Sequence, residues 1–230
     1  MKNIIKLSGL AVAVSAALTF SGTVAAYDAG DLIIRTGAAT VAPDVDSGNL
    51  KANGAVVNPA NPTTVDVDSN TQLGLSFTYM LDSNWGVELL AATPFSHTIK
   101  TKGGLASLGK LADVKHLPPT LTLQYYPMAS GDAFQPYVGA GINYTTFFSE
   151  DFKSNHKGSF KSLNLDDSWG LALQAGFDYA LTDNLGVNAA VWWIDIDTEA
   201  TFKSPDGATK YKVDVELDPM VYMVGLNYKF

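Results

Sequence analysis

The sequence predicts an all-β protein, an eight-stranded antiparallel transmembrane β-barrel with long extracellular loops and short periplasmic turns. Three observations predict this class. Eight segments alternate apolar with other side chains, the connections between them alternate in length, and the last segment ends on an aromatic residue. Successive side chains of a strand point to opposite faces, so a wholly apolar face requires either a protein core or lipid to cover it.

The carboxy-terminal segment shows the two faces most fully. One parity is wholly apolar and aromatic, and the other mixes small, polar and apolar residues. The apolar parity consists of Tyr222, Val224, Leu226, Tyr228 and Phe230. A soluble sandwich would bury this face in its core, whereas a membrane barrel turns it to lipid. The aromatic ending at Tyr228 and Phe230 resembles the signal by which barrel-assembly machinery recognises outer-membrane barrels.

The remaining strands and connections follow in order along the chain. The alternating segments are 30–41, 71–81, 85–98, 117–126, 137–148, 168–181, 185–198 and 212–230. Long connections at 43–70, 99–116, 149–167 and 199–211 alternate with short ones at 82–84, 127–136 and 182–184. Outer-membrane barrels combine long external loops with short periplasmic turns in this way. We expect solvated loops in the long connections, with a short helix at 104–113.

The length of one segment supports the membrane interpretation. Trp169 and Tyr179 share the outward face and lie ten residues apart. At about 3.3 Å per residue and a tilt near 40°, this is roughly 25 Å along the membrane normal, the height of the apolar band. We expect a periplasmic girdle of Trp85, Tyr125, Tyr179, Tyr228 and Phe230 and an outer girdle of Phe95, Phe148, Trp169 and Trp193.

The first 26 residues have the features of a secretory signal peptide. Lys2 and Lys6 precede an apolar run at 7–20, and small residues at 24–26 favour cleavage before Tyr27. An uncleaved anchor is the alternative, but the run is short for a spanning helix. Removal of two lysines and no acid changes the net charge from -8 to -10 and leaves residues 27–230 as a single barrel domain.

Composition excludes several functions. The chain has no cysteine, which rules out disulfides and thiol catalysis. Its acidic balance argues against a nucleic-acid partner. After the first segment, no run of 18 apolar residues predicts a spanning helix.

Six runs along the chain are distinctive: NTQLGLSFTYM (70–80), GVELLAATPF (86–95), HLPPTL (116–121), PYVGAGINYTTFF (136–148), DSWG (167–170) and IDIDT (194–198). Together they resemble the outer membrane protein W family of small barrels in the bacterial outer membrane. The resemblance implies an eight-stranded barrel whose apolar lumen passes small hydrophobic compounds. Family members also serve as receptors for phage or bacteriocins through their loops, which carry little of the resemblance.

Inward-facing residues predict an apolar well above a charged floor. The apolar positions toward the loops are Leu90, Ala92, Phe147, Trp192, Ile194, Ile196, Val215, Leu217 and Val221. The inward charges toward the periplasm are Arg35, Glu88, Asp178 and Lys229, which we expect to form a paired cluster. Leu90 and Trp192, on opposite sides at mid-height, predict a constriction. The alternative is that these groups merely fill the lumen of a structural anchor.

Prolines interrupt the strand patterns near the outer leaflet. Pro94, Pro118, Pro119 and Pro219 cannot donate to a β-ladder. Pairing across the second long connection brings Pro94 near Pro119, which predicts a weak lateral seam; two bulges are the alternative.

Catalysis and metal binding have little support. His97 and His116 flank one long connection without an evident third ligand. Ser149, Asp151, Ser154 and His156 could supply a triad only if a flexible loop held them in place. We therefore expect no enzyme activity, no metal and no cofactor.

The function expected from the sequence is a channel for small hydrophobic molecules, with lateral release into the membrane lipid. The alternative is a non-transporting surface receptor, or a structural or stress-related anchor.

Overall fold

The computed structural model describes residues 27–128 and 132–230, and the expected signal peptide lies outside these ranges. Their regular structure is β throughout, apart from one turn of 3-10 helix, η1 (Ala106–Leu108). No helix in the described ranges is long and apolar enough to cross a membrane.

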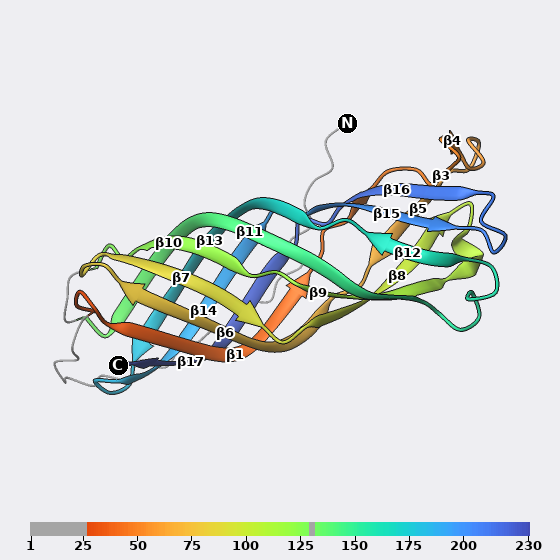
Figure 1. The fold of residues 1–230 in the computed structure, drawn as a ribbon. Coiled ribbons are helices and arrows are strands. Elements are labelled where there is room, and N and C mark those ends of the chain that lie inside the picture. Colours follow the sequence, from red (N-terminus) through yellow and green to blue (C-terminus); the bar gives the residue numbers. More distant parts are fainter. Residues whose placement is uncertain (1–26, 129–131) are drawn as a thin grey trace.

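Eight antiparallel strands form a closed barrel (Figure 1). They are β1 (Leu32–Ala42), β6 (Asn70–Met80), β7 (Trp85–Ala92), β10 (Thr120–Tyr125), β11 (Phe134–Phe152), β13 (Ser168–Ala180), β14 (Leu185–Ile194) and β17 (Met220–Lys229). Their order is β10-β7-β6-β1-β17-β14-β13-β11, and β10 pairs with β11 to close the ring. The first and last strands meet, with Ile33 opposite Lys229. The expected fold class is confirmed.

The two faces of the barrel follow the alternation in the sequence. Leu173 is 53% exposed, whereas its neighbour Gln174 is 5% exposed and lies in the lumen. Leu226 is exposed on β17, beside the buried Asn227. A barrel with apolar side chains outside and polar ones inside is stable only with lipid around it.

The expected aromatic girdles are present except at one position. Four of the five periplasmic aromatics are exposed and Tyr179 is half-buried, and Trp169 packs on Tyr144 at the outer rim with ring centroids 4.7 Å apart. Phe148 and Trp193 are half-buried. The placement of Phe95 on the outer face was wrong, because its side chain is only 1% exposed and faces inward. The strand breaks at Thr93 and Pro94, and the break reverses the parity beyond it.

The long connections continue as strands that extend the barrel outward, which corrects the expectation of solvated loops. One sheet of this extension contains β5 (Thr63–Val67), β8 (Phe95–Gly103), β9 (Lys110–Leu117) and the upper end of β11. The other contains β12 (Lys161–Leu165), β15 (Asp197–Lys203), β16 (Lys210–Glu216), β2 (Asp46–Ser47), β3 (Lys51–Ala52) and β4 (Ala55–Val56). The helix expected at 104–113 was wrong: η1 supplies one turn, and β9 begins at Lys110.

Breaks in the strands separate the barrel from its extension. β7 and β8 are separated at Thr93–Pro94, β9 and β10 at Pro118–Pro119, and β16 and β17 at 217–219, which includes Pro219. Proline lacks the N–H that a ladder needs, so pairing is interrupted at these positions. β11 runs through both parts without a break (Figure 1).

We predict that arginine on the lipid face destabilises the barrel. Leu173→Arg or Leu226→Arg should cost about 2–4 kcal/mol near the bilayer midplane and less toward a rim. The measurement is a denaturant titration of refolding into lipid vesicles. Ser96→Arg is the control, because Ser96 lies in the extension opposite Lys115 and is exposed. Equal costs at all three positions would contradict the assignment of the lipid-facing surface.

Candidate functional site

A buried charge cluster spans the lower lumen, and Arg35 is its centre. Arg35 Nη2 lies 2.6 Å from Asp178 Oδ2, and Nη1 lies 3.1 Å from Glu88 Oε2. The arginine side chain is 1% exposed, and both carboxylates are equally buried. The three side chains occupy inward-facing positions on β1, β7 and β13. Buried charges at this depth are tolerated when each has a partner of opposite sign.

Polar neighbours satisfy the remaining atoms of this cluster. Asp178 accepts hydrogen bonds from the Tyr27 hydroxyl at 2.8 Å, Asn188 Nδ2 at 2.9 Å and Asn227 Nδ2 at 2.6 Å. Arg35 Nη2 donates to the Tyr126 hydroxyl at 2.8 Å. Side chains from β1, β7, β13, β14 and β17 therefore meet across the lumen, and we call Arg35, Glu88, Asp178 and these neighbours the floor.

A packed apolar layer lies among the buried residues of the lumen. Leu90 and Trp192 belong to one buried cluster, which also contains Val41, Ile194 and Met223. β7 and β14 are four strands apart in the ring of eight, so Leu90 and Trp192 project from opposite walls. The expected constriction is thus a region of close packing.

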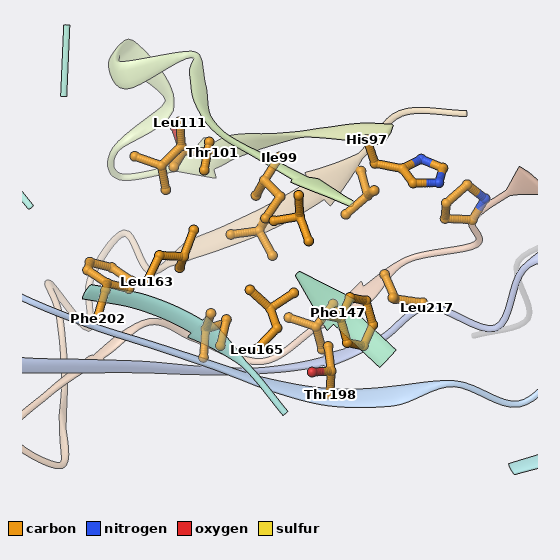
Figure 2. Close-up of a pocket in the computed structure, with 18 of the residues that line it drawn as sticks. His97, Ile99, Thr101, Leu111, Phe147, Leu163, Leu165, Thr198, Phe202 and Leu217 are labelled. Atoms are coloured by element: carbon orange, nitrogen blue, oxygen red, sulfur yellow. The ribbon is translucent and has the colours of Figure 1, made fainter. Parts of the chain in front are cut away.

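A large apolar cavity lies in the extension, between its two sheets (Figure 2). Its space is about 1020 Å³, including its opening to solvent. His97 lies at one end of the view and Phe202 at the other, with Ile99 and Leu165 on facing walls. The apolar walls also include Val65, Leu111, Ala112, Phe147, Val213, Val215 and Leu217. The side chains that the strands β5, β8, β15 and β16 turn inward form this second apolar interior.

Two histidines line the wall of this cavity. His97 Nδ1 lies 2.5 Å from the carbonyl oxygen of Asp68, and His97 Nε2 lies 3.0 Å from His116 Nε2. The His116 ring stacks against Phe95 and Phe147 with centroids 5.5 and 5.9 Å away. His116 is opposite Phe147, three residues beyond the rim aromatic Tyr144 on β11, so the pair lies outside the spanning barrel. Burial lowers the pKa of both imidazoles, and for His116 burial and the neighbouring His97 lower the pKa to about 3.

A smaller apolar pocket lies where the strands break. Leu90, Ala91, Ala92, Phe95 and Pro118 line it, together with Ala39, Val41, Ile194 and Val221. The β7–β10 ladder ends at Leu90 opposite Thr120, and β8–β9 pairing resumes at Phe95 opposite His116. No ladder pairing joins residues 91–94 to residues 117–119, all of which the structure describes. We call this gap the seam.

Comparison with known proteins identifies the family. The model of the OmpW family matches residues 28–230. The chain belongs to the OmpW family. It is 48% identical to outer membrane protein W of Vibrio cholerae, over 95% of this chain and 97% of that protein. The crystal structure of OprG from Pseudomonas aeruginosa is 55% identical and superposes with a TM-score of 0.85, covering 90% of this chain and 99% of that one.

A more distant relative, the dibenzothiophene metabolism operon protein PahQ of Pseudomonas aeruginosa, is 28% identical over 73% of this chain and 75% of that protein. The relatives and the barrel place this OmpW-family protein in the bacterial outer membrane.

The structure brings together some of the residues that the sequence singled out. Arg35, Glu88 and Asp178 meet in the floor, whereas the Lys229 ammonium lies 3.9 Å from Asp31 outside this cluster. Phe147 lines the large cavity, while Leu90, Ala92 and Ile194 line the smaller pocket. The sequence placed the expected ligand at the level of Leu90 and Trp192. The large cavity lies farther out than this level, in the extension.

The other residues that the sequence singled out contact different partners and do not form a common site. His156 Nε2 lies 3.0 Å from the carbonyl oxygen of Leu108, and Asp151 pairs with Lys157 at 3.4 Å, so their contacts do not form a triad. Tyr228 and Phe230 are exposed, with ring centroids 4.7 Å apart, and their role in assembly stays a prediction. In the described residues, one group of three possible metal ligands occurs, Asp195, Asp197 and Asp218 at the junction with the extension.

Sequence reasoning missed several residues of the site. Tyr126, Asn188 and Asn227 belong to the floor, and their polar character at inward parity was the available signal. The cavity walls show short alternations such as Val65 with Val67 and Leu163 with Leu165. These alternations predict further strands within the long connections.

We predict that the floor depends on charge balance. Arg35→Met leaves Glu88 and Asp178 buried without a cation and should cost about 3–5 kcal/mol. Adding Glu88→Gln and Asp178→Asn removes the unpaired charges, so the triple variant should recover most of that stability. Refolding titrations in vesicles measure both. A triple variant as unstable as the single one would show that charge pairing does not hold the floor together.

Proposed function

We propose that the protein is a conduit for small apolar molecules, which enter the cavity of the extension and leave through the seam into the outer leaflet. The observation that carries this proposal is the large apolar cavity beyond a closed, charged floor. A ligand gains roughly 25 cal/mol for each Å² of apolar surface that it buries there. The floor opposes straight passage, since an apolar molecule would have to separate paired charges.

The two apolar spaces are adjacent, which supports a route to the membrane. Val41 lines both the large cavity and the smaller pocket. Phe95 lines the smaller pocket and stacks on His116, which lines the large cavity. Movement of the Phe95 ring would join the two spaces.

The seam supplies an exit at the level of the outer leaflet. Ala92 and Pro118 face each other across it when the β7–β10 register is extended by two residues beyond Leu90 and Thr120. Ala91, on the outward parity, also lines the smaller pocket. The pocket therefore reaches the barrel wall at the one place where the β7–β10 ladder is interrupted.

The name of one relative is consistent with this proposal. PahQ is named for an operon of dibenzothiophene metabolism, and dibenzothiophene is an apolar aromatic molecule. A barrel that admits such compounds needs an apolar interior rather than an aqueous one. An eight-stranded barrel is too narrow for a general aqueous pore.

We predict that locking the seam abolishes uptake. The chain has no cysteine, so Ala92→Cys with Pro118→Cys introduces a single disulfide pair. Oxidation should reduce uptake of an apolar fluorescent compound by proteoliposomes to near the protein-free rate, and reduction should restore it.

The matched control is Val87→Cys with Leu123→Cys, a register pair lower on the same two strands. This disulfide should leave uptake unchanged. If the seam disulfide forms and uptake stays at the wild-type rate, lateral release is wrong. If vesicles with the wild-type protein take up no more of the compound than protein-free vesicles, the conduit proposal is wrong. A surface receptor or a structural anchor then replaces it.

A further inference from the structure

Three lysines lie side by side at the outer end of the extension. Lys203, the last residue of β15, is opposite Lys161 of β12 on one side and Lys210 of β16 on the other. All three are exposed, and we call them the lysine row. Like charges directly opposite each other in a sheet are destabilising, so the row costs stability unless an anion lies beside it.

The row is on the outer face of its sheet. Phe160, Phe202 and Tyr211 each neighbour one of these lysines in the chain, and their rings pack together inside the extension. The Phe202 ring lies 5.2 Å from that of Phe160 and 4.9 Å from that of Tyr211, measured between centroids. Alternation along the strands therefore turns the three lysines to the outside.

The acid nearest to the row in the chain is used in a turn. Asp206, between β15 and β16, accepts hydrogen bonds from the Ser204 hydroxyl and the Ala208 N–H. The Lys161 ammonium donates to the Pro205 carbonyl oxygen at 2.6 Å, which is a neutral acceptor. Among the described residues, no carboxylate forms an ion pair with the row.

The next pair of lysines toward the membrane has acids beside it. Lys51 and Lys212 are also opposite each other, on β3 and β16. Carboxylate oxygens of Asp214 lie 3.3 Å from both ammonium groups, and Glu199 pairs with Lys212 as well. The same sheet thus balances its inner lysines with its own acids, whereas the lysine row at its outer end is left for an anion from outside.

The height of the row above the membrane limits what that anion can be. The Asp197 N–H, at the start of β15, donates to Ser168 Oγ beside the rim aromatic Trp169. Lys203 is at the other end of β15, roughly 20 Å farther along the strand (Figure 1). Sugars of lipopolysaccharide occupy this layer of a bacterial outer membrane, and some of them carry phosphate. A neighbouring copy of this chain would present its own lysines at this height and repel the row.

The spacing of the row suits a phosphate group. Neighbouring strands lie about 4.8 Å apart, so the three side chains start within about 10 Å of one another. Their flexible stems allow the ammonium groups to converge on one anion. A phosphate monoester carries about two negative charges and three strong acceptor oxygens, whereas a carboxylate offsets one lysine.

We propose that the lysine row binds a phosphorylated sugar of the lipopolysaccharide that surrounds the barrel. Lysine is a common phosphate ligand and acts as a point charge, which requires no fixed geometry. The bound sugar layer holds the outer end of the extension, while the aromatic girdles hold the barrel in the bilayer. The row lies outside the apolar cavity, so this inference is independent of the proposed conduit.

The test uses the mature protein in nanodiscs of zwitterionic lipid. The probe is the phosphorylated core oligosaccharide that remains after lipopolysaccharide is fully deacylated, and the same oligosaccharide after dephosphorylation is the comparison. Calorimetric titration measures the Kd, and amide NMR resonances of Lys203 and Lys210 report the place of binding. We expect the phosphorylated sugar to bind more tightly, to shift these resonances and to bind more weakly as salt is added.

Variants of the row separate specific binding from general attraction. Lys203→Gln should weaken binding about three- to tenfold, and the triple variant with Lys161→Gln and Lys210→Gln should abolish it. Both should refold with at least the wild-type stability, because each relieves repulsion between like charges. Lys102→Gln is the matched control, since Lys102 is exposed on the other sheet and pairs with Asp66 at 3.1 Å. Its Kd should equal that of the wild type.

Three outcomes would overturn the proposal. Equal weakening by Lys102→Gln and Lys203→Gln would show attraction to the whole surface and no site at the row. Equal binding of the phosphorylated and dephosphorylated oligosaccharides would show that phosphate is not recognised. If a heparin fragment binds through the row and the core oligosaccharide does not, the partner is a sulfated polysaccharide from outside the bacterium, and the assignment to lipopolysaccharide is wrong.

Discussion

The ion pairs of Arg35 with Glu88 and Asp178 determine what the rest of the barrel can do. Their charges lie in the lumen, where separating them without replacement partners would cost several kcal/mol. Tyr27, Asn188 and Asn227 complete the hydrogen bonds of Asp178, so this buried carboxylate has polar partners besides Arg35. A ligand that reaches the lumen from outside therefore meets a barrier that apolar contacts cannot offset. This barrier is the reason for proposing a lateral route.

Proline divides the molecule into a lipid-facing barrel and an extension. The outward side chains of the barrel require lipid, whereas the extension turns its apolar side chains inward and its charged ones to water. Lys100 and Lys102, for example, pair with Asp68 and Asp66 on its surface. The strand breaks at Pro94 and Pro118 lie at the boundary between these two environments. A wall that must be continuous in lipid is interrupted there, because these residues cannot donate to the ladder.

The sequence predicted the barrel well because lipid enforces a strict alternation. Leu173 and Gln174, or Leu226 and Asn227, could be assigned to opposite faces from parity alone, and the distance of Glu88 and Asp178 from short turns placed them near one end. Phe95 could not be assigned to the correct face, since the break at Pro94 exchanges the inward and outward positions beyond it. Only the strand register on either side of the break shows this exchange. Much of the extension was missed because several of its strands are short and their alternation, as at Val65 and Val67, is brief. The contact between His97 and His116 depends on the same shifted register, so no spacing in the sequence predicts it.

The position of a bound apolar molecule tests the central claim most directly. Crystals of the protein soaked with bromooctane would locate the ligand through the anomalous scattering of bromine. The account predicts bromine in the cavity beside Ile99 and Phe202, or in the smaller pocket between Leu90 and Pro118. Bromine bound only on the lipid-facing surface, or alongside Arg35 in an open floor, would contradict it.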